Sequence, residues 1–197
     1  MDLPRPLVRS AWAGLLVAAL GASAPAYAVP AVPQDEPALA VAWQGALWPA
    51  DIALLAGEYL RLYGHSAQAA GIARIRDAAQ RTADLLRTQD VRLYRTAFEA
   101  GHGAAASLLS SDDLEDRRRA ALGDAEAAWR QSQLWPAGHA RRLGWLHLAE
   151  LLGNGRAAYE LALHYRRDDR PLLAARHEAQ AQALGYLQPY ALDHARK

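Results

Sequence analysis

Alanine dominates this sequence of 197 residues, since 46 of its positions carry it. Alanine is the best intrinsic helix former because its side chain loses no conformational freedom when the helix forms. β-branched residues are scarce and never alternate with polar ones, so the period-2 pattern of a half-buried strand is missing. The sequence therefore predicts an all-α protein of about eight or nine helices.

Helix-breaking residues divide the chain into short helices joined by tight turns. Periodic apolar residues predict a first helix over 51–63, and a serine cap predicts a second over 66–87. Turns this short are typical of antiparallel neighbours, so we expect a stack of antiparallel helical hairpins. The further helices are expected over 88–100, 104–109, 112–135, 136–152, 154–167, 171–185 and 189–195.

The first 28 residues have the pattern of a secretory signal peptide. Arg5 and Arg9 precede the apolar run AWAGLLVAAL, and the small residues Ala26 and Ala28 occupy the positions before a cleavage site. The run has about half of the roughly 20 apolar residues that span a bilayer, which favours cleavage over an uncleaved anchor. We expect a periplasmic or secreted protein.

Composition excludes several kinds of chemistry. The chain has no cysteine, so disulfides, a thiolate nucleophile and a cysteine-based zinc site are ruled out. Cleavage of the leader removes two of the 22 basic and one of the 21 acidic residues, which leaves 20 of each. A net charge near zero gives no general attraction to nucleic acid or anionic lipid, and we expect no stable membrane insertion after cleavage.

The mature chain is expected to have two parts. Residues 29–50 are predicted to be a flexible or extended lead-in, because three prolines fall between Val29 and Ala40 without any periodic apolar pattern. Residues 51–197 are predicted to form one all-α, repeat-like domain, which is long enough for a single core. Trp43 and Trp48 are interpreted as packing anchors, with a partner contact as the alternative.

The residues around Gly153 are symmetrically spaced. Trp145 and Ala149 precede this glycine by eight and four residues, and Ala157 and Leu161 follow it at the same distances. Glycine ends a helix here because it accepts a left-handed backbone, and the alanines one turn away allow two helix axes to approach. An irregular alanine-rich bundle is the alternative. The offsets recur around Gly101, and on one side of Gly185, at Leu93, Ala97, Ala105, Leu109, His177 and Ala181.

The stretch WLHLAELLGNGRAAYELALHY resembles the junction of two Sel-one-like repeats, which are a variant of the tetratricopeptide repeat. One unit of that family ends with W-x-x-x-A-x-x-x-G, and the next opens with G-x-x-x-A-x-Y-x-L-[GA]-x-x-Y. The positions that match are Trp145, Ala149, Gly153, Ala157, Tyr159, Leu161, Ala162 and Tyr165, and in the following segment Ala174, Ala181 and Gly185.

This resemblance is best over residues 140–185, with His177 where the family has an aromatic residue. The predicted long helix over 112–135 interrupts the array, since the glycines at 101 and 153 are too far apart for one repeat. The resemblance implies a stack of helical hairpins that binds proteins or peptides and performs no chemistry. Glu160 and His164 lie one turn apart outside the matched positions, and we expect them to contact a ligand.

Seven histidines prompt a search for a metal site. The zinc-protease pattern H-E-x-x-H is missing, and no carboxylate joins His139 and His147 at ligand spacing. We therefore predict no metal and no cofactor, although His139, His147, His164 and His177 lie on neighbouring predicted helices and could converge. The acidic residues over 112–116 lack the glycine and terminal glutamate of a calcium loop and are interpreted as the first turn of a helix.

No catalytic residue is identified. The leading hypothesis is an exported, non-enzymatic interaction module, either a scaffold or adaptor or an inhibitor or immunity factor of a bacterial-type envelope, whose partner is another protein or peptide. A small cell-wall enzyme such as a peptidoglycan hydrolase, with Glu58 as general acid, is the second hypothesis. A histidine-dependent metal or haem carrier is the third. Glu58→Gln separates the first two, and elemental analysis tests the third.

Overall fold

The computed structural model describes residues 32–89 and 110–187 of the chain. These residues form eight α-helices and no strand, which confirms the predicted all-α class. The leader, the helices expected within 90–109 and 189–195 and the repeat around Gly101 lie outside the described residues. The helices are α1 (Glu36–Gly45), α2 (Pro49–Tyr63), α3 (Ala69–Thr88), α5 (Ser111–Ala121), α6 (Ala125–Gln133), α7 (Ala140–Leu151), α8 (Gly155–Arg167) and α9 (Pro171–Ala183).

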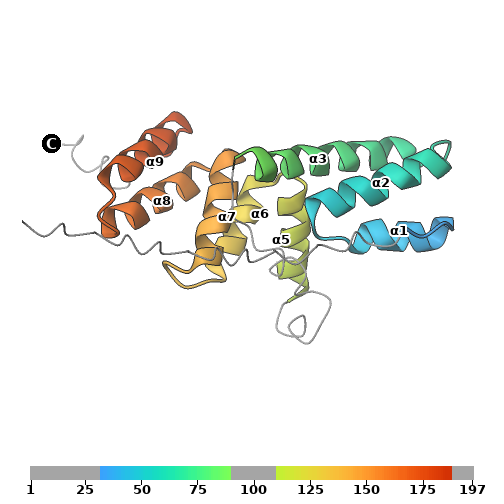
Figure 1. Ribbon diagram of the computed structural model, residues 1–197, viewed down its shortest axis with the longest axis horizontal. Helices are drawn as coiled ribbons and strands as arrows, with labels where there is room; N and C mark the ends of the chain where they lie inside the picture. The colour runs from blue at the N-terminus through green and yellow to red at the C-terminus, as the bar shows by residue number, and fades with distance from the viewer. Residues whose placement is uncertain (1–31, 90–109, 188–197) are drawn as a thin grey trace, which may run out of the picture.

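The described helices pack in the order in which they occur along the chain. Every pair in extensive contact is consecutive, from α1 with α2 to α8 with α9. Figure 1 shows the result as an elongated row, with α1, α2 and α3 at one end and α8 and α9 at the other. Because each helix packs mainly on its neighbours, the arrangement has the quasi-one-dimensional character of helical repeat proteins.

Two hairpins share a turn sequence that recurs after thirty residues. The turn between α5 and α6 reads LGDAEAA, and the turn between α7 and α8 reads LGNGRAA. Gly123 and Gly153 have φ angles of +97° and +100°, a left-handed conformation that glycine adopts without strain. Each glycine therefore ends one helix and reverses the chain into the next.

The residues after each glycine cap and seat the second helix of the hairpin. The side chain of Asp124 accepts a hydrogen bond from the Ala127 amide at 2.9 Å, and Asn154 accepts one from the Ala157 amide at 2.9 Å. These bonds satisfy backbone donors that a helix start leaves without a partner. The alanines that follow are fully buried where consecutive helices meet, and they are Ala127, Ala128, Ala157 and Ala158.

The predicted single helix over residues 112–135 is wrong. The structure has two helices there, α5 and α6, separated by the turn at Gly123. A left-handed glycine followed by a capping aspartate ends a helix for the same local reasons as at Gly153. Arg119 stands four residues before Gly123 in place of the alanine found at 149, so this turn did not match the expected spacing. The stack is therefore not interrupted here.

The predicted lead-in over residues 29–50 is wrong for residues 36–45, which form α1. The carboxylate of Asp35 caps this helix by accepting a hydrogen bond from the Ala38 amide at 2.9 Å, and a proline lies in its first turn. Leu39 and Trp43 are one turn apart and are buried against α2. Pro33 thus precedes the helix and Pro37 lies in its first turn, and Trp43 is a packing anchor.

The core is continuous and rich in small residues. One cluster runs from α2 to α8, and more than half of its buried members are alanines, while Trp145, Leu148 and Leu161 supply much of its bulk. A second cluster joins α1, α2 and α3. The residues expected to shape the repeat fall into three groups. Gly153 and Gly185 have positive φ, and Tyr159 and Tyr165 are half-buried. The others are buried, and they are Trp145, Ala149, Ala157, Leu161 and Ala181.

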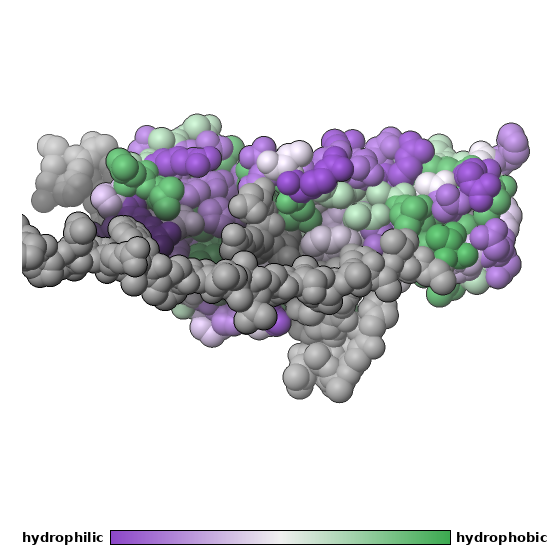
Figure 2. Space-filling model, in the orientation of Figure 1, coloured by the Kyte–Doolittle hydropathy of each residue, from purple (hydrophilic) through white to green (hydrophobic). Residues whose placement is uncertain are grey.

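The surface is mixed in character. Figure 2 shows hydrophilic residues along α3 and apolar residues gathered near the end of the row formed by α1 and α2. Val41 on α1 contributes to the exposed apolar surface, as does Leu172 on α9. None of the helices in 32–89 and 110–187 is both long enough and apolar enough to cross a bilayer.

Candidate functional site

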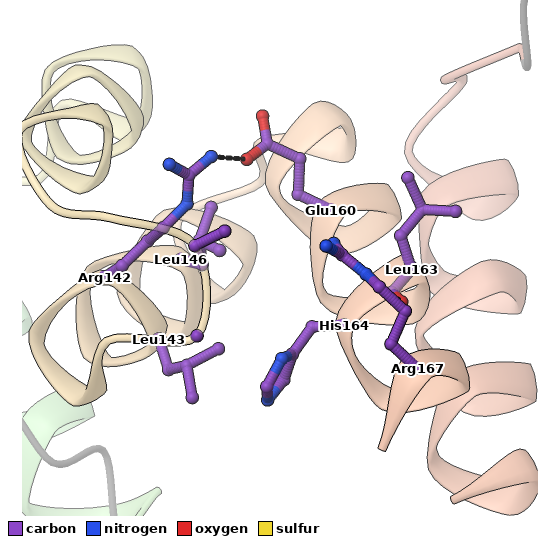
Figure 3. Close-up of a pocket in the computed structure, with 9 residues that line it drawn as sticks. Arg142, Leu143, Leu146, Glu160, Leu163, His164 and Arg167 are labelled. Carbon is purple, nitrogen blue, oxygen red and sulfur yellow. Dashed lines mark hydrogen bonds and ion pairs between the residues drawn. The ribbon is translucent and has the colours of Figure 1, made fainter. Parts of the chain in front are cut away.

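A pocket of about 220 Å³ lies between α7 and α8 (Figure 3). The turn before α7, at Ala137 and Gly138, forms its edge. Its apolar wall is formed by Leu143 and Leu146 from α7 and by Leu163 from α8. Its polar groups come from the same two helices and are Arg142, Glu160, His164 and Arg167. The structure thus brings Glu160 and His164, the two residues predicted to bind a ligand, to one pocket.

The carboxylate of Glu160 ties α6, α7 and α8 together. Arg142 donates from Nη2 to Oε2 of Glu160 at 2.8 Å, and the indole of Trp129 donates from Nε1 to Oε1 at 2.9 Å. The guanidinium of Arg156 lies 3.7 Å from the same Oε1 and stacks 3.9 Å from the centre of the Trp129 ring. A carboxylate with so many internal donors fixes the wall of the pocket.

His164 and Arg167 give the pocket its outer polar surface. The His164 side chain extends from α8 toward α7 in Figure 3, and its Nε2 lies 3.3 Å from Oδ2 of Asp168. Arg167 is exposed and donates from Nε to the Leu163 carbonyl at 3.2 Å. Because the lining carboxylate of Glu160 is already paired with Arg142, Arg167 gives the rim a positive charge beside the His164–Asp168 pair. A leucine-lined pocket with such a rim suits an apolar group next to a negative charge.

A second polar cluster is centred on Glu150, where α7, α8 and α9 meet. Nδ1 of His177 lies 2.7 Å from Oε1 of Glu150, and Nδ1 of His147 lies 3.8 Å from Oε2. The Tyr165 hydroxyl is 3.0 Å from Nε2 of His147, and the Tyr165 ring stacks on His177 with centres 5.2 Å apart. One ligand-type atom from each of the two histidines and Glu150 lies within 4.8 Å of the other two.

The electrostatics of this cluster favour an ionised carboxylate in the interior. Glu150 is 8 % exposed, and burial by itself raises the pKa of its carboxyl. The hydrogen bonds and charges of His147 and His177 outweigh burial and hold the pKa of Glu150 below its usual range. Burial raises the pKa of the Tyr165 hydroxyl, with a further contribution from the charge of Glu150. The cluster is therefore an anion facing two imidazoles.

From the sequence, four histidines on neighbouring predicted helices could converge. The structure brings two of them, His147 and His177, together. His139 lies elsewhere, since its Nδ1 accepts a hydrogen bond from the Arg141 amide at the start of α7. Glu150 was missed, because the sequence was searched for a carboxylate that joins His139 and His147, whereas Glu150 lies beside His147 and His177. The signal was present, because H-x-x-E on a helix places both side chains on one face.

Glu58, the residue of the cell-wall-enzyme hypothesis, lies on α2 and pairs with Arg61 at 2.8 Å. Pairs of this kind, three residues apart on a helix surface, are ordinary features of solvated helices. Glu58 lines neither the α7–α8 pocket nor the pocket formed by α2 and α3 near Trp48. Its surroundings therefore add no support for a general acid at this position.

No family model, no curated protein and no solved structure matches this chain. The features that bear on its function are therefore the packing of its helices in chain order and the two polar sites on α7, α8 and α9.

Proposed function

We propose that this chain is an exported, non-enzymatic repeat-like protein that binds another protein or a peptide, as a scaffold, an adaptor or an inhibitor. The observation that carries the proposal is the packing of the described helices in strict chain order. Stacks of this kind leave extended surfaces along the row, which repeat proteins use to bind partners. The recurrence of the LGD and LGN turns also supports the resemblance to Sel-one-like repeats.

The α7–α8 pocket is the proposed anchor point for the partner. Its leucine wall is large enough for one apolar side chain, and His164 and Arg167 lie where they contact whatever flanks that side chain. The partner is therefore a protein segment or peptide with an apolar residue next to an acidic side chain or a terminal carboxylate. Arginine binds carboxylates through paired hydrogen bonds, so Arg167 is the group that discriminates.

Charge reversal at the pocket tests this proposal. The protein is used as bait in an envelope extract, with Arg167→Glu as the test variant and Arg176→Glu, an exposed position on α9 outside the pocket, as the matched control. We expect the natural chain and Arg176→Glu to recover the same stoichiometric partner and Arg167→Glu to recover at least about tenfold less of it. Equal recovery by all three proteins, or recovery of no partner, contradicts the proposal.

Export is tested separately. The protein is isolated from a cell that secretes it, and its N-terminal residue is determined by mass spectrometry. We expect the mature chain to begin at Val29, directly after the small residues of the leader. A chain that retains residues 1–28 and fractionates with membranes contradicts the cleavage.

A further inference from the structure

We propose that His147, Glu150 and His177 bind one divalent transition-metal ion of the zinc class at the junction of α7, α8 and α9. Two imidazoles and one carboxylate form a donor set that zinc accepts in proteins, with a fourth position left to solvent or to another ligand. Imidazole donors favour zinc, copper and nickel, whereas a calcium or magnesium site is built from oxygen atoms alone. This site is separate from the α7–α8 pocket and does not depend on the proposed partner.

The distances in the cluster are close to those of a filled site. Zinc bonds of about 2.0–2.2 Å place the ligand atoms of a tetrahedral site roughly 3.3–3.6 Å apart. Oε1 of Glu150 lies 2.7 Å from Nδ1 of His177, and its Oε2 lies 3.8 Å from Nδ1 of His147. One ligand atom from each of the three residues lies within 4.8 Å of the other two. Loading therefore separates the first pair and draws His147 inward by side-chain rotation, with no change of the helices.

The buried negative charge of Glu150 favours a cation at this place. Glu150 holds its carboxylate in the interior, where an ionised group is costly unless an opposite charge or several donors compensate it. His177 now donates one hydrogen bond to that carboxylate across the α7–α9 contact. When a dication binds, Nδ1 of His177 gives up that proton, which leaves to solvent or moves to Nε2. The ion then offsets the carboxylate charge directly and links α7 to α9 through coordinate bonds.

The neighbouring tyrosine orients the proposed ligands. His147 turns Nδ1 toward Glu150 and Nε2 toward the Tyr165 hydroxyl, 3.0 Å away. When Nδ1 binds an ion, the proton of His147 resides on Nε2, where it is donated to Tyr165. The Tyr165 ring also stacks on His177 with an interplanar angle of 11°, which fixes the second imidazole. Partners that hold the second nitrogen of a ligating histidine are typical of metal sites.

The site has one open side. The side chain of His147 is 30 % exposed, compared with 9 % for Glu150 and 7 % for His177. An ion therefore enters past His147, and solvent on that side supplies the remaining ligand. This difference in exposure also identifies the safest position to mutate, since a change at His147 leaves the buried pair of Glu150 and His177 intact.

Titration with zinc tests the proposal. The full-length, tag-free chain is stripped with a chelator and titrated with Zn²⁺ by calorimetry, and Co²⁺ then serves as a spectroscopic probe. We expect one ion per chain with micromolar affinity or tighter, a rise in the melting temperature on loading, and visible Co²⁺ bands typical of a four-coordinate site. His147→Gln should weaken binding at least about tenfold and abolish those bands.

His65→Gln is the control, because His65 is exposed in the turn after α2 and lies outside both the cluster and the α7–α8 pocket. It should leave the affinity, the stoichiometry and the Co²⁺ spectrum unchanged. Glu150→Gln should also lose the ion, and if that variant does not fold the comparison at 147 still decides. The proposal is overturned if the natural chain binds no zinc, if His147→Gln binds it equally well, or if His65→Gln loses it.

Discussion

The hairpins α5–α6 and α7–α8 share a backbone plan and differ in what they bury. LGDAEAAWRQSQLW, from the first, aligns without a gap with LGNGRAAYELALHY, from the second. The leucine, the glycine and two alanines are identical, and Trp129 and Trp135 correspond to Tyr159 and Tyr165. The shared residues set the turn and the closest helix contacts. The positions that differ determine what each hairpin holds inside.

The first hairpin holds a polar bridge inside, which consists of the hydrogen bonds that join Arg117, Gln131 and the Asp113 carbonyl. Arg117 is buried and donates from Nε to Oε1 of Gln131 at 2.9 Å, and Gln131 donates to the Asp113 carbonyl at 3.0 Å. The corresponding positions of the second hairpin are His147 and Leu161. One backbone plan thus supports a hydrogen-bonded bridge in one hairpin and an apolar contact beside the histidine cluster in the other.

Truncation of the largest core residue should have the greatest effect on this comparison. Trp145 in α7 is 1 % exposed, whereas Glu115, thirty residues earlier, is exposed. Trp145→Ala should lower the free energy of unfolding by about 3–5 kcal/mol, because it leaves a cavity in the main cluster. Glu115→Ala should change it by less than about 0.5 kcal/mol. Urea denaturation measures both free energies of unfolding. Similar losses for the two variants would contradict the difference in burial between Trp145 and Glu115.

Exchange of the polar bridge for its apolar counterpart should have the next largest effect. Gln131→Leu introduces the residue found at 161, but it removes one hydrogen-bond partner each from Arg117 and from the Asp113 carbonyl. We expect a loss of about 1–3 kcal/mol, because Arg117 and the Asp113 carbonyl each lose a hydrogen bond inside the protein. Leu161→Met keeps volume and polarity and should cost less than about 1.5 kcal/mol. A Gln131→Leu variant as stable as the natural chain contradicts the bridge.

The third difference lies at the first residue of the second helix, which is Ala125 in one hairpin and Gly155 in the other. A Cβ on Gly155 would lie 2.8 Å from Cβ of Tyr186 and 3.2 Å from Cβ of Leu184. Gly155→Ala should therefore lower stability by about 1–3 kcal/mol through overpacking. Gly71→Ala in α3, where nothing lies within 4 Å, should raise it by about 0.4–1 kcal/mol. Thermal unfolding distinguishes the two, and stabilisation by both refutes the close contact.

The smallest effect concerns the helix caps, Asp124 in the first hairpin and Asn154 in the second. Burial raises the pKa of the Asp124 carboxyl, but hydrogen bonds from the Ala127 amide and from Arg119 outweigh burial and hold its pKa below the ordinary value. Its contribution to stability is therefore complete above the unfolded pKa of about 3.9 and is lost as pH falls through the folded pKa.

Asp124→Asn places the cap of the second hairpin in the first. It keeps an acceptor for the helix amides and loses the ion pair with Arg119, whose side chain is 51 % exposed. We expect a loss of about 0.3–1 kcal/mol at pH 7 that disappears as the pH falls through the lowered folded pKa of Asp124. Denaturation series at several pH values measure this difference. A constant difference between the two proteins across that range would show that the charge of Asp124 contributes nothing.

Most of the helices could be predicted because their signals are local. The expected ranges 51–63 and 171–185 match α2 and α9 closely, since proline, glycine and the apolar period act within a few residues. The two wrong helix predictions came from local residues that were misinterpreted. The prolines around Asp35 are typical of an extended segment, although here they lie before and within the first turn of a capped helix. The turn at Gly123 was missed because position 119 carries an arginine and not the alanine expected from the repeat.

The candidate sites were less accessible to prediction. Glu160 and His164 could be chosen as polar groups one turn apart outside the matched repeat positions, but the hydrogen bond that joins Glu160 to Trp129 spans 31 residues. The cluster at Glu150 was missed for the same reason, although the His147–Glu150 spacing is a local signal. The spacing of His147 and Glu150 indicates a possible site only once the fold places a third group, His177, beside them.

The sequence by itself determined that this chain is helical and where most of its helices begin and end, because caps, left-handed glycines and helical periods depend on neighbouring residues alone. Only the tertiary structure decided that Glu150 meets His177, 27 residues away. That meeting depends on how α8 packs on α7 and how α9 packs on α8, because α7 and α9 each contact α8 extensively and not each other. Packing of this kind joins residues far apart in the chain, and no short stretch of sequence specifies it.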